Sequence, residues 1–246
     1  MKLGLIGEKL SHSFSKSYFE TKFKEENLTN HSYDLFELDS IDKIRDLFES
    51  DTNLDGLNVT IPFKESVLPF VDFIDEEAQK IGAINTIKIT RKGQFLFTEG
   101  FNTDVYGFSN SIKPFIKNTH ERALILGTGG ASKAVEYVLK NLGIDILYVS
   151  RNPNKKQLQY EDINQNVLKH YKLIVNCTPL GMFPNINTFP NIPYNFLDES
   201  HTLIDLVYNP TKSKFLEKGE KQGTSILNGL SMLQQQAEKS FEIWNK

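Results

Sequence analysis

Four polar stretches in the first half of the chain could bind and deprotonate a small alcohol. They follow or adjoin strand-like segments and cover residues 11–15, 58–64, 82–86 and 100–104. Their serine, threonine and asparagine side chains offer many hydrogen bonds, which suits a ligand rich in hydroxyl groups. One lysine, Lys64, and one aspartate, Asp104, occur among them. Such a pair can transfer a proton, so we expect an active site for a polyhydroxylated substrate.

A glycine-rich turn in the second half is typical of a dinucleotide site. Gly127, Thr128, Gly129, Gly130 and Ala131 follow an apolar run and precede a helix-like segment. Glycines let the backbone approach a pyrophosphate, and a helix N-terminus offers it unpaired N–H groups and partial positive charge. The third glycine of the G-x-G-x-x-G pattern is replaced by a serine here, at a position where small residues are tolerated. The alternative is a turn that only packs a helix on a sheet.

The next predicted strand indicates which cofactor would bind. NAD-binding domains usually place an acidic residue there to bond the ribose 2′-hydroxyl. This strand ends in Ser150-Arg151-Asn152, and no acidic residue lies between 146 and 160. Arg151 could bind a 2′-phosphate, which an acid would repel. The pattern therefore favours NADP, while the nearby Lys155 and Lys156 could equally be solvated loop residues.

Strand-like and helix-like segments alternate along the chain, which predicts an α/β fold with mostly parallel strands. Predicted strands cover residues 2–7, 32–38, 54–60, 123–126, 146–150, 173–177 and 203–207, with a hairpin at 86–90 and 94–99. Predicted helices cover residues 17–26, 41–49, 70–81, 104–116, 131–142 and 230–244. Open α/β sheets bind ligands beyond the carboxyl ends of their strands, where the polar stretches and the glycine turn fall.

The motifs divide the chain into two predicted domains. Residues 1–103 would form a three-layer α/β domain that binds substrate, and residues 229–246 would pack back on it as a C-terminal helix. Residues 104–228 would form a Rossmann-like, doubly wound NADP-binding domain.

Composition excludes several classes of function. The chain has 246 residues and a formal net charge of -3, so nothing attracts it as a whole to nucleic acid or anionic membrane. One cysteine, the lack of a signal peptide and the lack of a long apolar run predict a cytoplasmic protein. Five scattered histidines show no metal-ligand spacing, and we expect no metal site. Ser11 and His12, which precede Ser13 in the first polar stretch, are interpreted as structural.

Taken in order, these motifs resemble the shikimate dehydrogenase family over nearly the whole chain. The segments that carry the resemblance are Ser13-Phe14-Ser15, Asn58 to Lys64, Gly82 to Thr86, Asn102-Thr103-Asp104, Gly127 to Ala131, Asn176 to Met182, Asp205 to Tyr208 and Asn228 to Leu233. The chain departs from the family in having Lys16 in place of proline, Phe19 where histidine is frequent, and Ser150-Arg151-Asn152 for Asn-Arg-Thr.

The resemblance implies an NADP-dependent enzyme that reversibly reduces 3-dehydroshikimate to shikimate, in the biosynthesis of chorismate and the aromatic amino acids. It implies that Lys64 and Asp104 are catalytic. The implied substrate-binding residues are Ser13, Ser15, Thr60, Asn85, Tyr208 and Gln236. The implied cofactor-binding residues are Gly127, Thr128, Gly129, Gly130, Ala131, Ser150, Arg151, Asn152, Thr178 and Gly229.

Two mechanisms for Lys64 are open. Burial would favour a neutral lysine that accepts the proton, whereas a nearby Asp104 would favour the charged ammonium. In the second case Lys64 would stabilise the developing alkoxide, and protons would pass through Asp104.

Two other functions fit the same motifs. One is a quinate/shikimate dehydrogenase that uses NAD, against which Arg151 argues. The other is a non-catalytic NADP-binding regulator, which would be expected to have lost Lys64 or Asp104. Either way the partner would be a small molecule, and the protein would be a monomer or a homodimer.

Overall fold

The computed structural model describes residues 1–10 and 13–246 and divides into two compact units. The first unit contains Met1–Thr103 and Ala237–Lys246, and the second contains Asp104–Gln236. Ser11 and His12, both interpreted above as structural, lie outside the described residues. The C-terminal helix α8 (Leu230–Trp244) contributes to both units.

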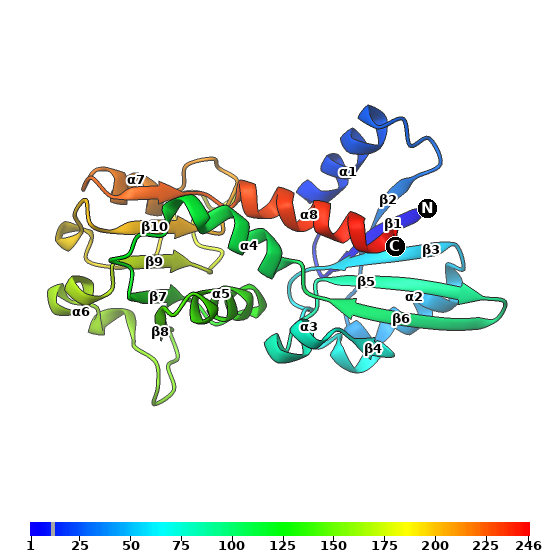
Figure 1. Cartoon of the computed structure of the whole chain (residues 1–246), viewed down its shortest axis with the longest axis horizontal. Coiled ribbons are helices and arrows are strands. Elements are labelled where there is room, and N and C mark those ends of the chain that lie inside the picture. The colour runs from blue at the N-terminus through cyan, green and yellow to red at the C-terminus, as the bar shows by residue number, and fades with distance from the viewer. Residues whose placement is uncertain (11–12) are drawn as a thin grey trace. The chain divides into compact units, whose positions relative to one another are not determined.

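The first unit is built on a six-stranded mixed sheet with the order β2-β1-β3-β5-β6-β4 (Figure 1). Its strands are β1 (Lys2–Gly7), β2 (Ser32–Glu37), β3 (Leu54–Val59), β4 (Phe73–Ile74), β5 (Thr86–Lys92) and β6 (Phe95–Phe101). Only β5 runs antiparallel to its neighbours in this sheet. The carboxyl ends of β3 and β6 therefore flank the start of β5, which gathers three of the four polar stretches at one edge.

Alternating residues of the strands fill two hydrophobic cores, as expected when each face of a sheet is covered. Ile6 packs in one core with residues of α2 (Ile44–Ser50) and α3 (Glu76–Ile81). Its neighbour Leu5 packs in the other core with residues of α1 (Phe14–Glu25) and α8. These two cores give the first unit the three layers that the sequence predicts.

The helix predicted at residues 70–81 is wrong in its first half. Asp75 accepts a hydrogen bond from the Glu77 N–H (3.0 Å) and so begins α3 only at Glu76. The preceding segment is tied to β6, because Asp72 accepts from both the N–H and the hydroxyl of Thr98 at 2.8 Å. That attachment leaves residues 73–74 extended as β4.

The second unit is a parallel sheet with the order β11-β10-β9-β7-β8 (Figure 1). Its strands are β7 (Arg122–Leu126), β8 (Asp145–Val149), β9 (Leu173–Asn176), β10 (Thr202–Asp205) and β11 (Ser225–Leu227). Its further helices are α4 (Asp104–Ile112), α5 (Gly130–Asn141), α6 (Gln165–His170) and α7 (Lys214–Glu220). The order reverses between β7 and β9, the position where doubly wound sheets bind their ligands.

The α/β prediction is confirmed, but three elements of the second unit were not predicted. These are the helices α6 and α7 and the edge strand β11. Each spans seven residues or fewer, too short for a recognisable period. The starts of the two helices are set by local caps instead. Asn164 accepts from the Asn166 N–H (2.9 Å) before α6, and Ser213 accepts from the Leu216 N–H (3.4 Å) before α7.

Candidate active site

The carboxyl end of β3 positions Thr60 and Lys64. The Thr60 N–H donates to Ile6 O of β1 (2.9 Å), so the chain leaves β3 in the plane of the sheet. Lys64 is half-buried, and its carbonyl oxygen accepts from the Ile84 N–H (2.7 Å). Lys64 is thus held beside the segment that contains Asn85.

Asn85 is buried at the start of β5, with 2% of its surface exposed. Its Oδ1 accepts from the Thr103 N–H (2.7 Å), and its Nδ2 donates to Thr103 Oγ1 (2.9 Å). The adjacent Asn102 is fixed in turn, since its Nδ2 donates to Ala83 O (2.9 Å). These bonds join the polar stretch before β5 to the one after β6.

Ser13 and Ser15 lie at the start of α1. Ser13 occupies the cap position of this helix without making a side-chain cap bond. Its Oγ is buried and has no hydrogen-bond partner among the described residues. Burial raises the pKa of Tyr33, and the nearby Ser15 side chain partly offsets this rise. A buried hydroxyl without a partner is costly, so Ser13 is suited to a ligand that supplies an acceptor.

Asp104 and Gln236 belong to the second unit, on two helices in direct contact. Asp104 is buried as the first residue of α4, and Gln236 is buried on α8. A Cβ at Gly107 of α4 would lie 3.0 Å from Gln236 Cβ, which shows how closely the helices approach. Gln236 Nε2 donates to Leu233 O (2.8 Å). Tyr208, the other substrate-binding candidate of this unit, is partly buried.

The glycine turn after β7 has the features that a pyrophosphate requires. Gly127 has a φ of 97°, a left-handed conformation that favours glycine. Among residues 1–10 and 13–246, a Cβ at Gly129 would meet no atom within 4 Å, and no side chain caps α5 at this end. Ser132, which replaces the third glycine, is buried and donates through its hydroxyl to Gly129 O (2.6 Å). The Ser132 N–H is bonded to Gly129 O (2.9 Å), and the other N–H groups at the start of α5 have no side-chain cap in the described part of the chain, which fits a dinucleotide phosphate. Thr128 is exposed in this turn, and Gly130 and Ala131 are half-buried.

The end of β8 presents the residues proposed to select the cofactor. Ser150 Oγ accepts from the Asn152 N–H (3.2 Å), which shapes the turn. Arg151 and Asn152 are exposed. Burial raises the pKa of Tyr160, and the nearby Arg151 charge partly offsets this rise. Arg151 thus provides an exposed positive charge at the strand end, as a 2′-phosphate site needs.

A buried network after β9 holds Thr178 against the glycine turn. Asn176 Oδ1 accepts from the N–H (3.0 Å) and the hydroxyl (2.6 Å) of Thr178. The Thr178 methyl carbon would lie 2.8 Å from a Cβ at Gly127. Asn176 Nδ2 donates to Asp205 Oδ1 (2.9 Å), so the position of Thr178 depends on a carboxyl group of β10.

Asp205 is the centre of this network and was given no role from sequence. Its carboxyl also accepts from the Val207 N–H (3.0 Å) and from the Ser213 hydroxyl. Burial raises the pKa of Asp205 to about 6, although these hydrogen bonds act in the opposite direction. The Val207 carbonyl accepts from the Gly229 N–H (3.1 Å), which connects the last cofactor-binding candidate to the same loops. The one signal in the sequence is that an acidic residue, Asp205, occurs in the otherwise apolar strand predicted at 203–207.

The predicted site residues are therefore divided between the two units. The first unit contains Ser13, Ser15, Thr60, Lys64 and Asn85. The second contains Asp104, Tyr208 and Gln236 together with every cofactor-binding candidate.

The described residues also bear on two further features, a metal site and a membrane span. No group of three or more His, Cys, Asp or Glu residues among them is arranged to hold a metal ion. None of the helices in this part of the chain is long and apolar enough to cross a membrane.

The chain is similar to known proteins over nearly its whole length. A sequence model described as "Shikimate dehydrogenase substrate binding domain" matches residues 5–87. "Shikimate dehydrogenase (NADP(+))" of Clostridium beijerinckii is 38% identical, over 99% of this chain and 91% of that protein. The protein of the same name from Methanosphaera stadtmanae is 34% identical, over 98% of this chain and 90% of that protein.

Solved structures extend the similarity to the fold. Shikimate dehydrogenase 1 from Peptoclostridium difficile has a TM-score of 0.83 at 37% identity, covering 99% of this chain and 91% of that one. Shikimate 5-dehydrogenase from Thermus thermophilus, in complex with NADP(H) and shikimate, has a TM-score of 0.85 at 28% identity, covering 99% and 93%. Quinate dehydrogenase from Corynebacterium glutamicum, in complex with NAD, has a TM-score of 0.85 at 25% identity, covering 99% and 93%. On the near-complete match to relatives more than 30% identical, the chain belongs to the shikimate dehydrogenase family.

Proposed function

We propose that this protein catalyses the reversible NADP-dependent reduction of 3-dehydroshikimate to shikimate, in the pathway to chorismate and the aromatic amino acids. The observation that carries the proposal is the 38% identity, over 99% of the chain, to a relative named for this activity and cofactor. The sequence retains both a lysine and an aspartate where the resemblance requires catalytic groups, Lys64 and Asp104.

In this proposal the first unit binds the substrate carboxylate and part of its ring. Ser13, Ser15 and Thr60 hold the carboxylate, and the buried, unpaired Ser13 hydroxyl supports this assignment because a carboxylate would supply the acceptor it lacks among the described residues. Asn85 and Gln236 bind ring hydroxyls, and Tyr208 completes the substrate contacts. A buried amide discriminates strongly against a substrate that lacks the matching hydroxyl.

Lys64 and Asp104 handle the proton at the hydroxyl that becomes the carbonyl. In one mechanism a neutral Lys64 accepts this proton and Asp104 orients the hydroxyl. In the other, a charged Lys64 stabilises the developing alkoxide while Asp104 receives the proton. The burial of Asp104 and the half-burial of Lys64 suit groups that react away from bulk water.

NADP supplies the hydride chemistry when it is bound. Residues Gly127 to Ala131 would hold its pyrophosphate at the start of α5, where the open turn supports the fit. Ser150, Arg151 and Asn152 would bind the 2′-phosphate, and Thr178 and Gly229 would orient the nicotinamide ring. The exposure of Arg151 supports its part in this site.

The test is an initial-rate assay of the purified protein with shikimate and quinate, each with NADP and with NAD. We expect the largest kcat/KM with shikimate and NADP. Preference for quinate and NAD would replace the proposal with the alternative that the resemblance to the Corynebacterium enzyme favours. No turnover with any pair, while NADP binding remains measurable by calorimetry, would favour a non-catalytic regulator.

We also propose that the protein is cytoplasmic and acts as a monomer or homodimer without nucleic-acid or membrane partners. A single cysteine and a formal net charge of -3 support this view. Cell fractionation and sedimentation of the purified protein test it. A membrane-bound fraction or a larger assembly would contradict it.

A further inference from the structure

Ser240 lies among the polar residues that hold Asn85 in place. It is fully buried on α8 (0% exposed), and its oxygen accepts from Asn58 Nδ2 at 3.0 Å. Its hydroxyl also shares hydrogen bonds with the hydroxyls of Thr86 (2.7 Å) and Thr103 (3.1 Å). One side chain of the C-terminal helix thus connects the end of β3, the start of β5 and the segment after β6.

Thr86 and Thr103 are in turn direct partners of Asn85. The Thr103 N–H (2.7 Å) and the Thr86 hydroxyl (3.1 Å) both donate to Asn85 Oδ1. A backbone N–H can only donate, so it determines which end of the Asn85 amide carries the oxygen. The single hydrogen of the Thr86 hydroxyl is used in its bond to Asn85 Oδ1, so Thr86 accepts from Ser240. The Thr103 hydroxyl can either donate to Asn85 Oδ1 or accept from Asn85 Nδ2, and its bond with Ser240 influences which of the two it does.

The Asn58 amide is oriented by the same reasoning. Its Nδ2 lies 3.2 Å from Asn85 O, a carbonyl that only accepts, and its Oδ1 accepts from the Tyr33 hydroxyl at 2.7 Å. The nitrogen of Asn58 therefore faces Ser240, and the Ser240 oxygen must accept this bond. The single hydrogen of the Ser240 hydroxyl is then directed to the threonine pair.

The position of Ser240 is set one helical turn later by Trp244. Trp244 Nε1 donates to Ile87 O of β5 (2.9 Å), and its ring fills the space that a side chain at Gly56 of β3 would occupy. Residues four apart lie on the same face of a helix, so this contact directs Ser240 toward the same strands. Figure 1 shows this end of α8 beside β3 and β5.

We propose that Ser240 is a positioning residue of the active site, which orients the Asn85 amide for a substrate hydroxyl through Thr86 and Thr103. The inference rests on the proposed function, in which Asn85 binds a ring hydroxyl. Ser240 acts through Asn85, and its contribution is to align the amide before the substrate binds.

The first test compares Ser240→Ala, Asn85→Ala and the double variant in the intact protein. Removing the Ser240 hydroxyl leaves buried donors and acceptors without their partner, so the KM for shikimate should rise about three- to tenfold. The KM for NADP should stay within about twofold of wild type. In the Asn85→Ala background, the Ser240 substitution should add less than about twofold, because coupled residues are not additive.

A matched control is Ser111→Ala in α4. Ser111 is also a buried helical serine, but its hydroxyl donates only to Phe108 O of its own helix (2.9 Å) among the bonds described. It should leave both KM values unchanged. Thermal unfolding of each variant separates lost stability from lost alignment. Equal rises in both KM values for Ser240→Ala, or an undiminished penalty in the double variant, would overturn the proposal.

A second readout needs no turnover. In ¹⁵N-labelled protein, the side-chain amide resonances of Asn85 and Asn58 should shift in Ser240→Ala and stay unchanged in Ser111→Ala. Unchanged resonances in Ser240→Ala would overturn the inference. A wild-type protein that turns over no shikimate would instead contradict the proposed function, while the resonances still decide the role of Ser240.

Discussion

Individual polar residues of the first unit fall into two groups according to their hydrogen bonds. Asn58 and Asn85 have oxygen and nitrogen atoms that are both paired, and such pairing fixes the direction of an amide. The Ser13 hydroxyl is buried without a partner in the described part of the chain. Paired groups hold a site in shape, whereas an unpaired one marks where a ligand would gain a hydrogen bond.

Lys64 is the residue whose loss should affect chemistry most. Lys64→Ala should lower kcat by roughly 10²–10⁴, the range for removing a proton-transfer group, while shikimate binding by calorimetry changes little. Lys64→Arg separates the two mechanisms, because arginine stays protonated. Substantial activity in Lys64→Arg would indicate an electrostatic role, and activity near that of the alanine variant would indicate proton transfer.

The control is Lys43→Ala, which removes an exposed lysine paired with Asp39 (2.8 Å). It should have wild-type kinetics. A kcat for Lys64→Ala within about threefold of wild type would remove Lys64 from the mechanism.

Asp205 should make stability depend on pH. Burial raises its pKa in the folded protein to about 6, above its usual value near 4, so the folded state binds this proton more tightly than the unfolded state. The free energy of unfolding should therefore fall as pH rises from about 4 to 6. Asp205→Asn removes the contribution that this carboxyl makes to the pH dependence of the free energy of unfolding. Its stability relative to wild type should rise by on the order of 3 kcal/mol between pH 4 and 7, measured by urea unfolding.

An exposed aspartate serves as the comparison. Asp46→Asn removes the same charge at an exposed position of α2, so its urea unfolding measures the effect of the charge change alone. Parallel stability curves for wild type and Asp205→Asn would show that the Asp205 carboxyl is not perturbed in the folded protein.

Elements of secondary structure differ in how far local sequence determines them. Two elements have the predicted bounds, β1 and α8. Their signals are local: a short apolar run that ends in glycine for β1, and helical periodicity after a glycine for α8. The first half of the predicted helix at 70–81 was wrong because Asp72 bonds to Thr98 of β6, a contact 26 residues away in sequence, whereas residues 76–81 are helical as predicted. The edge strand β11 exists because β10 lies beside it. Tertiary pairing decides such short segments.

The turn before α5 should lose cofactor affinity when Gly127 is replaced. Gly127→Ala places a Cβ at a φ of 97° and 2.8 Å from the Thr178 methyl carbon, so the turn must shift. We expect the Kd for NADP, measured by calorimetry, to rise at least about tenfold, with shikimate binding unchanged.

Gly143→Ala is the matched control at the other end of α5. Gly143 also has a positive φ (74°), but a Cβ there would meet no atom of the described residues within 4 Å. It should cost a similar backbone strain of about 1–2 kcal/mol and leave NADP affinity unchanged. Equal losses of affinity in both variants would show that the Thr178 contact is unimportant.

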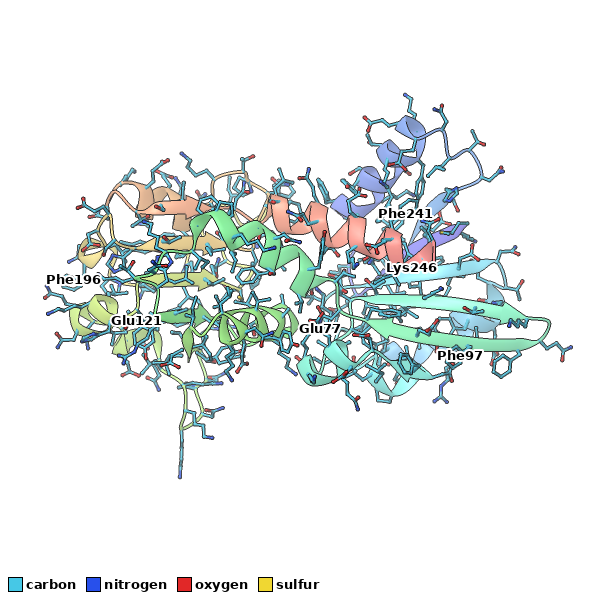
Figure 2. All side chains as sticks on the ribbon, in the orientation of Figure 1. Glu77, Phe97, Glu121, Phe196, Phe241 and Lys246 are labelled. Atoms are coloured by element: carbon cyan, nitrogen blue, oxygen red, sulfur yellow. The ribbon has the colours of Figure 1, made fainter. Side chains whose placement is uncertain are left out.

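At the scale of the whole molecule, the first unit is built from both ends of the chain. The backbone leaves this unit after Thr103 and returns at Ala237. The returning segment is part of the core: Phe19 of α1 packs against Phe241 (6.2 Å between ring centroids) and Trp244 (5.7 Å). Figure 2 labels Phe241 and Lys246 at this end of α8. Folding of the first unit therefore requires the last ten residues.

Trp244→Ala tests this dependence. Truncation of a buried aromatic residue typically costs about 3–5 kcal/mol, and here it also removes the bond to Ile87 O. Hydrogen exchange should speed up mainly in the amides of the first unit. Phe196→Ala, at a residue of the second unit that is 39% exposed and labelled in Figure 2, should cost less than about 1 kcal/mol. An equal loss of hydrogen-exchange protection in both units would contradict the expectation that Trp244 stabilises mainly the first unit.

The sequence by itself determined the α/β class, the glycine turn and the family, because these depend on periodicity, on glycine content and on motifs within short segments. The catalytic and binding assignments remain predictions from that resemblance. Only the tertiary structure decided that Asn58 and Ser240, 182 positions apart, share a hydrogen bond. Burial likewise decided the raised pKa of Asp205. Both depend on which strands and helices become neighbours, and short segments of sequence carry no record of that.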